Sequence, residues 1–317
     1  MVTGVSMSEQ RHRRSATQPI VVGVDVGGRS TSAVLWAAEE AERSGRSLRL
    51  ISAYPKEPAP DTDEGTLRND LAGLARRLTV ADLEYRVDVG SAPSVLLKAV
   101  ESSSLLVVGR RGRGGVHRRL IGSTSIAVAG RSPVPVVVVP EQWLQPRMSS
   151  APMVVGVELP HVPLQEKVSK VPQERRHLDQ GQLARNGAIL DFAFDRAGEL
   201  KVPLVVVNAF EIPAIYGWSA DDITDYRTRS EQALEDLLRP WRDDNPDVDV
   251  DARCVAETPK QAMLDAAGVA QLTVLGRHPG GHRPGSPIGS TTRGVLHHAE
   301  HPVAIVPVPV PSTEASS

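Results

Sequence analysis

The chain has 317 residues, of which 40% are hydrophobic and only 3% aromatic, with a formal net charge of −2 and one cysteine. This length predicts two domains, and the scarcity of aromatic side chains predicts cores of Val, Leu, Ile and Ala, as in buried parallel strands. The small net charge excludes a global field that recruits nucleic acid or membrane, and the single cysteine excludes an internal disulfide framework and favours a cytoplasmic location.

The first half of the chain alternates predicted strands and helices. Strands are predicted at 19–25, 48–53, 83–89, 104–108 and 134–139, and helices at about 30–44, 65–79, 92–101 and from 123. In the first helix, Val34, Ala37, Ala38 and Ala41 recur at the spacing of one helical face. This order predicts a parallel, doubly wound α/β domain over 19–140.

The second half repeats the first. Residues 153–158 repeat 20–25 almost letter for letter, and Leu190, Ala193, Phe194 and Ala197 have the spacing of the first helical face. Further strands are predicted at 204–209, 248–255, 272–276 and 303–306. An internal duplication therefore predicts a second domain of the same kind over 153–308.

The remaining segments are predicted to be tails and a linker. Residues 1–18 contain no apolar segment and are expected to be a disordered tail rather than a signal peptide. Residues 141–152 have no periodic pattern and are expected to link the domains, and 309–317 form a second tail. Apolar runs of six or seven residues are too short to span a membrane.

The segment from Val107 to Thr124 carries the strongest functional signal. A buried strand ends at Gly109, a glycine-rich loop follows, and hydroxyl residues open a helix at Ser123. Glycines let backbone N–H groups approach a phosphate, and a helix N-terminus adds about half a positive charge. We interpret the segment as a nucleotide phosphate site; the alternative is a surface loop with solvated arginines.

The spacing of Gly109, Gly112 and Gly122-Ser123 resembles the phosphate-binding signature of the universal stress proteins. With its repeat, the chain resembles a tandem universal stress protein over 19–140 and 152–307. The resemblance implies that each domain is a five-stranded parallel sheet with helices on both faces, of the adenine nucleotide alpha hydrolase-like type. It also implies ATP as the ligand, alone or with Mg²⁺, bound outside the carboxyl ends of the strands.

By this resemblance, Asp25 would hold the ribose or adenine side of the nucleotide, Gly23 would allow close approach, and the strand end at Ala53 would meet the adenine edge. The implied phosphate site of the first domain comprises Gly109, Arg110, Arg111, Gly112, Arg113, Gly114, Gly115, Gly122, Ser123 and Thr124. The corresponding residues of the second domain are Gly156, Glu158, Gly276, Gly289, Ser290 and Thr291.

The second domain departs from this pattern at three places. Glu158 replaces Asp25 and adds one methylene, and Pro279 replaces Gly112 and removes an N–H donor. A polar insertion is expected at about 159–187, because 34 residues separate Glu158 from Phe192 but 11 separate Asp25 from Trp36. We therefore expect the first domain to bind ATP well and the second weakly or not at all.

Other groups of residues give weaker indications of a function. The second half contains His278, His282, His297, His298 and His301, but no cysteine or carboxylate completes a recognised metal spacing, so solvated or phosphate-facing histidines are favoured over zinc. Cys254 is expected to be a buried packing thiol. The arginine-glycine run also resembles an RNA-binding segment, but no stacking aromatic occurs between Tyr85 and Trp143, which disfavours nucleic acid.

The sequence therefore predicts a cytoplasmic, ATP-binding regulatory protein of the stress response. ATP would order the arginine-glycine loop, and a regulatory partner or a second subunit would recognise the ordered surface. The apolar strands 134–139 and 303–306 are expected to pair the two domains and to support a further homodimer. Two alternatives remain: a slow ATPase or ATP-dependent enzyme, although no residue has a strong claim as general base, and a nucleotide-free interaction scaffold.

Overall fold

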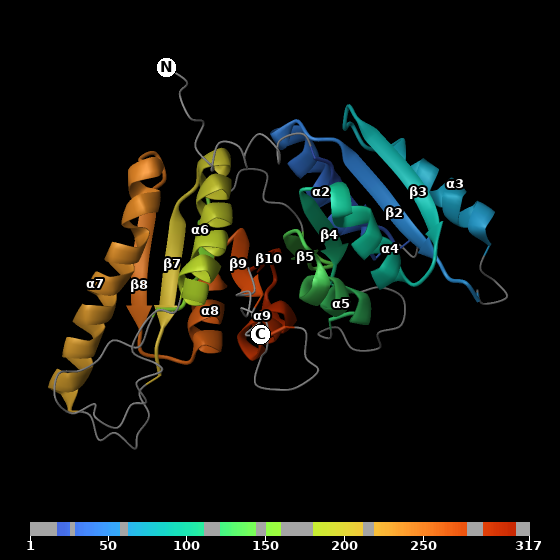
Figure 1. Ribbon diagram of the computed structural model, residues 1–317. Coiled ribbons are helices and arrows are strands. Elements are labelled where there is room, and N and C mark those ends of the chain that lie inside the picture. The colour runs from blue at the N-terminus through green and yellow to red at the C-terminus, as the bar shows by residue number, and fades with distance from the viewer. Residues whose placement is uncertain are drawn as a thin grey trace, which may run out of the picture. The chain divides into compact units, whose positions relative to one another are not determined.

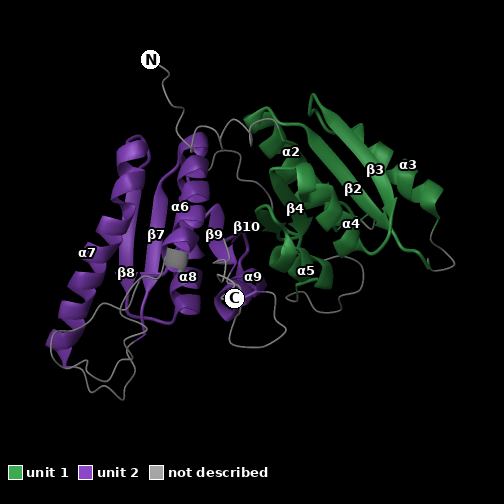
Figure 2. Cartoon of the chain, in the orientation of Figure 1, with its two compact units in different colours: residues 1–146 green, residues 147–317 purple. Residues whose placement is uncertain are grey.

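The computed structural model forms two compact units, residues 1–146 and 147–317, hereafter unit 1 and unit 2 (Figure 1, Figure 2). It describes residues 18–25, 29–57, 63–110, 121–143, 150–159, 180–211, 219–277 and 288–308. The boundary between the units falls within the expected linker 141–152. Each unit is an α/β domain with a parallel sheet, and each is described by itself below.

The described residues of unit 1 form five strands in the order β3-β2-β1-β4-β5, and all neighbouring strands are parallel. The strands are β1 (Ile20–Gly23), β2 (Leu48–Tyr54), β3 (Leu83–Val89), β4 (Leu105–Gly109) and β5 (Val136–Val139). The helices are α2 (Thr31–Ser44), α3 (Glu64–Ala75), α4 (Ala92–Ala99), the 3₁₀ turn η1 (Val100–Ser102) and α5 (Ser123–Arg131). The strand order reverses between β1 and β4, which creates a topological switch point at the carboxyl ends of these two strands.

Unit 2 repeats this topology with the order β8-β7-β6-β9-β10, again parallel throughout. The strands are β6 (Met153–Gly156), β7 (Leu204–Ala209), β8 (Val250–Val255), β9 (Leu272–Arg277) and β10 (Val303–Pro307). The helices are α6 (Gln180–Leu200), α7 (Ala220–Asp244), α8 (Pro259–Ala267) and α9 (Ser290–His298). The predicted fold class, a duplicated parallel α/β domain, is confirmed.

Aliphatic side chains form the cores, as the composition predicted. The central strands β1, β4, β6 and β9 are buried on both faces. The predicted helical faces are confirmed: the first comprises Val34, Ala37, Ala38 and Ala41, the second Leu190, Ala193, Phe194 and Ala197, and all eight are buried. Continuous apolar runs therefore mark strands that helices cover from both sides.

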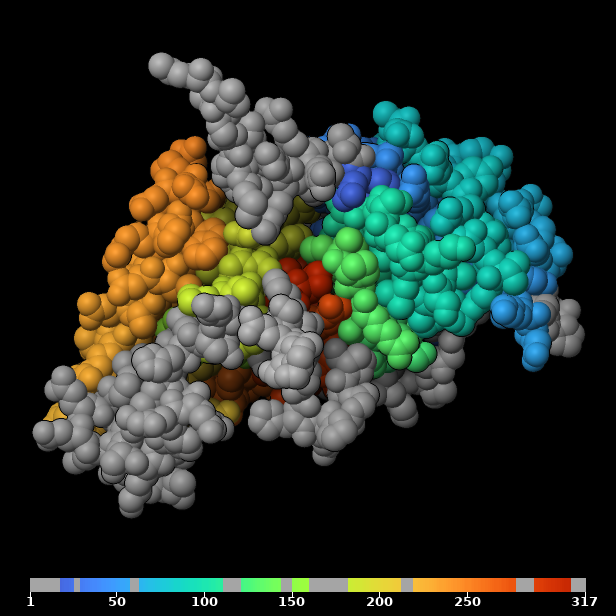
Figure 3. Space-filling view, in the orientation of Figure 1, coloured from blue at the N-terminus to red at the C-terminus, as the bar shows by residue number. Residues whose placement is uncertain are grey.

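Two helices of unit 2 are longer than their counterparts in unit 1. Helix α6 begins at Gln180, so residues 180–187, which were expected to belong to a polar insertion, are helical. Helix α7 has 25 residues against 12 in α3, and its Tyr226, Ser230, Leu234 and Leu238 are buried at four-residue intervals. Figure 3 shows α7, in orange, forming the outer surface of unit 2. No helix within the described ranges is long and apolar enough to cross a bilayer.

Candidate functional site

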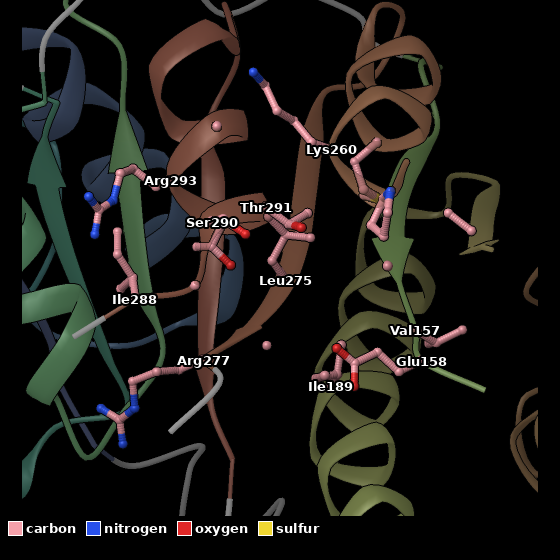
Figure 4. Close-up of a pocket in the computed structure, with 18 of the residues that line it drawn as sticks. Val157, Glu158, Ile189, Lys260, Leu275, Arg277, Ile288, Ser290, Thr291 and Arg293 are labelled. Carbon is pink, nitrogen blue, oxygen red and sulfur yellow. The ribbon is translucent and has the colours of Figure 1, made fainter. Parts of the chain in front are cut away.

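A cavity of about 740 Å³ opens in unit 2 at the carboxyl ends of β6 and β9, which is the topological switch point of that sheet (Figure 4). All six residues that the sequence indicated for the second domain line it: Gly156, Glu158, Gly276, Gly289, Ser290 and Thr291. Ala209 also lines the cavity and is the counterpart in β7 of Ala53 in β2. The structure therefore brings the candidate residues of unit 2 together around one cavity.

Glycines end the central strands because helices approach the sheet closely there. A Cβ atom on Gly156 would lie 3.0 Å from Met263 Sδ of α8, and one on Gly276 would lie 2.5 Å from Ile189 Cδ1 of α6. In unit 1, a Cβ atom on Gly23 would lie 2.9 Å from Leu96 Cδ1 of α4. The space beside Gly23 is thus filled by a leucine, so helix packing accounts for this glycine without a ligand.

The acidic residue that follows the first strand is held in the same way in both units. In unit 1 the Ser30 hydroxyl accepts from Asp25 N–H and donates to Asp25 C=O, both at 3.0 Å. In unit 2 the Asn186 amide accepts from Glu158 N–H at 3.3 Å and donates to Glu158 C=O at 2.6 Å. These bonds fix the backbone that carries each carboxylate beside the switch point.

A helix N-terminus faces each switch point. Helices α5 and α9 begin after Gly122 and Gly289, and neither has a side-chain cap on its first N–H groups. Such N–H groups and the helix dipole together favour an anion. In unit 1, Gly122 N–H donates to Arg110 C=O at 2.8 Å and Ser125 Oγ donates to Gly109 C=O at 2.7 Å, so Gly109, Arg110, Gly122 and Ser123 lie together. Arg111, Gly112, Arg113, Gly114 and Gly115 lie outside the described residues.

Most of the charged residues that line the described part of the cavity of unit 2 are cationic. The described lining includes one carboxylate, on Glu158, and four cationic side chains: Arg185, Lys260, Arg277 and Arg293. Burial lowers the pKa of the Arg277 guanidinium below its ordinary value. Sequence reasoning missed these four cations because they lie on helices or at a strand end, outside the glycine-hydroxyl motif. A position-by-position comparison of the two halves would have found Lys260 and Arg293, which stand where the first half has Pro93 and Ile126.

The histidines of unit 2 separate into two groups. His297 and His298 line the cavity, and His298 Nδ1 lies 2.8 Å from Gly294 C=O. His301 Nε2 lies 2.7 Å from Thr273 Oγ1, and burial lowers the pKa of His301 to about 4. His278 and His282 lie outside the described residues. Within the described ranges, no group of three His, Cys, Asp or Glu side chains could hold a metal ion.

Cys254 is buried in β8, as expected of a packing thiol. Its Sγ donates to Asn208 Oδ1 at 3.9 Å. Burial, followed by the nearby charges of Glu231 and Glu235, raises the pKa of Cys254 to about 12. The thiol therefore stays protonated at neutral pH and is a poor nucleophile.

Two parallel α/β units with matching switch points, glycine-ended strands and uncapped helix N-termini define a tandem, doubly wound protein with an anion-receptive cavity. Comparisons with known proteins identify the family within this class. The sequence model described as "Universal stress protein family" matches residues 16–140 and 179–307. The chain belongs to the universal stress protein family.

The matched proteins include full-length tandem relatives. Universal stress protein Rv1996 of Mycobacterium tuberculosis is 27% identical over 327 residues, covering 92% of this chain and 95% of that protein. A solved structure of a functionally unknown Pseudomonas aeruginosa protein, PA1789, has a TM-score of 0.65 at 16% identity and covers 94% of this chain and 95% of that one. The solved structure of a universal stress protein in complex with cAMP is 28% identical in sequence, and the match covers 39% of this chain and 98% of that protein. Its TM-score of 0.33 is too low to assign a ligand here.

Proposed function

We propose that this protein is a cytoplasmic, nucleotide-binding regulator of the stress response that takes ATP and acts through occupancy rather than turnover. The observation that carries the proposal is the cavity of unit 2, which is lined by glycine-ended strands, by the uncapped N-terminus of α9 and by residues that include four cations. Negatively charged phosphates match both the helix dipole and the cations. Membership of the universal stress protein family supports the same assignment.

The proposal extends to unit 1 by the duplicated topology. There the N-terminus of α5, the Gly109 strand end and the Asp25 segment occupy the equivalent positions. Unit 1 keeps Gly112 where unit 2 has Pro279, so it retains one more backbone donor in the loop. We propose that unit 1 is the stronger ATP site and unit 2 the weaker one.

The regulatory step would be an ordering of the arginine-glycine loop of unit 1 by the bound phosphates. A second copy of the chain, in a homodimer, or a regulatory protein would recognise that ordered surface. Such coupling requires that the two loop states differ in their affinity for ATP.

The test is the nucleotide content and affinity of the full-length protein. Purified protein is denatured and its released nucleotide is separated and quantified, and ATP affinity is then measured by isothermal titration calorimetry with and without Mg²⁺. We expect adenine nucleotide in the purified protein and an increased melting temperature when ATP is added. Absence of both at millimolar ATP would overturn the proposal.

A further inference from the structure

Strand β3 lies at one end of the strand order of unit 1, and within the described part of that unit it pairs only with β2 (Figure 1). Asp82 C=O accepts a hydrogen bond from β2 at 2.9 Å and Gly90 N–H donates one to β2 at 2.8 Å, so the even-numbered residues of this segment face β2. Successive residues of a strand direct their backbone groups to opposite sides. The N–H and C=O groups of Tyr85, Val87 and Val89 therefore point away from β2, and no described residue bonds them.

Tyr85 and Val89 are also the exposed apolar side chains of this strand. Their exposed fractions are 45% and 58%, and both lie on the same face of the strand as the buried Val87, because side chains alternate between the two faces. By the register of the two edge strands, unit 2 has Ala252 and Ala256 at the corresponding positions. Unit 1 therefore exposes an aromatic ring and a branched side chain where unit 2 has methyl groups.

Unit 2 blocks the equivalent edge, which is formed by β8. Asp249 C=O and Val255 C=O accept from β7 at 2.8 Å and 3.0 Å, so the intervening even-numbered residues face outward. The outward C=O of Val250 accepts from Arg242 Nη2 of α7 at 3.2 Å. Helix α3 has 12 residues against 25 in α7, and no described side chain bonds the outer side of β3. An uncovered strand edge of this kind is a template for pairing with another strand.

The sequence of β3 is complementary to itself in one antiparallel register. With Val87 opposite its copy, Tyr85 of one chain lies opposite Val89 of the other, and Arg86 lies opposite Asp88. The outward backbone groups make the Val87–Val87 and Tyr85–Val89 pairs the hydrogen-bonded ones. Arg86 and Asp88 then form non-hydrogen-bonded pairs, in which the opposing side chains approach most closely.

The two neighbouring registers bring like charges together. Centring the pair on Arg86 places that residue against its copy and Glu84 against Asp88. Centring it on Tyr85 places Asp88 against Asp82. Like charges that lie directly opposite each other destabilise an antiparallel pair. Charge complementarity therefore selects the register in which the two exposed apolar side chains also cover each other.

We propose that β3 is an interface for a second copy of this chain, and that two copies join antiparallel through residues 83–89 with Val87 on the two-fold axis. Such an interface is isologous, because both copies contribute the same strand. It joins the sheets of two unit 1 domains by the addition of one strand edge to another. It is separate from strands 134–139 and 303–306, which the sequence favoured for a homodimer, and it does not depend on nucleotide binding.

The test is the oligomeric state of the full-length protein, measured without nucleotide by analytical ultracentrifugation over a range of concentrations. Arg86→Asp and Asp88→Arg each place like charges opposite each other twice, because symmetry repeats the pair. We expect each substitution to raise the dimer dissociation constant about ten-fold or more. We expect an equimolar mixture of the two variants to form a heterodimer, because opposite charges then face each other at both pairs. Combining both substitutions in one chain should also restore the dimer.

Two further variants separate the interface from general effects on folding. Asp251→Arg changes an exposed carboxylate that is paired with Arg253 on the edge strand of unit 2, so it is the matched control and should leave dimerisation unchanged. Tyr85→Lys combined with Val89→Lys replaces the exposed apolar pair by like charges. Because both side chains are exposed, the variant should stay folded in a thermal melt and sediment as a monomer.

The outcomes decide the inference independently of the proposed function. A full-length protein that remains monomeric at about 100 μM would overturn it. A dimer that is unaffected by both single charge reversals, or weakened equally by Asp251→Arg, would place the interface on another surface and overturn it as well. Two weakened variants that fail to form a heterodimer would overturn the register centred on Val87. Nucleotide binding by any of these folded variants bears only on the proposed function.

Discussion

The side chain of Asn186 binds both backbone polar groups of Glu158, 28 residues earlier in the chain, with its Nδ2 2.6 Å from the carbonyl oxygen and its Oδ1 3.3 Å from the amide nitrogen. Ser30 makes the same pair of bonds to Asp25. A serine in unit 1 and an asparagine in unit 2 thus hold the segment after the first strand against the first helix. The duplication preserved the bonding pattern while the residues changed.

The first prediction concerns this pair of bonds. Asn186→Ala should lower the unfolding free energy by about 1–3 kcal/mol, because it leaves a donor and an acceptor of Glu158 without their partner. Urea denaturation followed by circular dichroism measures the change. Thr228→Ala, which removes an exposed hydroxyl bonded to Thr224 C=O, is the matched control and should change stability by less than about 0.5 kcal/mol. Equal effects of the two substitutions would contradict the role of Asn186.

The second prediction concerns the contact between Gly276 and Ile189. Gly276→Ala should destabilise unit 2 by about 1–3 kcal/mol, because the added methyl group overlaps the buried Ile189 side chain, which must shift to accommodate it. Combining it with Ile189→Val should recover part of that loss, which a double-mutant cycle of denaturation midpoints detects. Strict additivity of the two substitutions would show that the contact is not the cause. Gly268→Ala, at the end of α8, is the control. A Cβ atom there would lie 3.5 Å from the Asp265 carbonyl oxygen, an ordinary contact, so this substitution should destabilise unit 2 by less.

The third prediction concerns His301 and pH. Its pKa is lowered in the folded state to about 4 from 6.5, so the unfolded chain binds more protons between these values and stability falls as pH decreases from 6.5 toward 4. The expected loss between pH 7 and pH 5 is about 2 kcal/mol from this group. Denaturation curves at both pH values should show a smaller difference in unfolding free energy for His301→Gln than for the unsubstituted protein. If the two proteins show the same difference, the pH dependence comes from other groups.

The fourth prediction concerns Gly294, in the middle of α9. A Cβ atom there would lie 2.8 Å from Lys260 Cδ, so the glycine leaves space for the lysine stem. Gly294→Ala should stabilise α9 by about 1 kcal/mol when combined with Lys260→Ala, through helix propensity alone. With Lys260 present the gain should be smaller, because the lysine must move. Thermal melts of the four variants test this, and equal gains in both backgrounds would exclude the contact.

The strands and the first helix of each unit could be predicted from sequence because buried parallel strands are continuous aliphatic runs and the helical faces keep a regular spacing. Helix α7 was missed, although Ser219 and Asp222 form a capping box and Leu234 and Leu238 continue a four-residue repeat. Its many charged residues conceal a narrow apolar stripe, and no helix was predicted there. The start of α6 was missed for the same reason.

Only those residues of the candidate site that belong to short sequence motifs could be predicted. The strand-end glycines and the helix-opening hydroxyls of unit 2 are identified by spacing, and the structure places all six around one cavity. The contact of Ile189 with Gly276 and that of Lys260 with Gly294 join residues far apart in the chain. No periodicity encodes such contacts, because they depend on how the helices cross the end of the sheet.

The hydrogen bond from Gly122 N–H to Arg110 C=O joins the two ends of the arginine-glycine loop. This bond holds the two ends of the loop together at the carboxyl end of β4, so the loop is closed by a backbone hydrogen bond. Length and composition inside such a loop can vary at small entropic cost, since closure depends only weakly on the number of residues enclosed. Changes inside this loop should therefore leave the sheet beneath it unaltered.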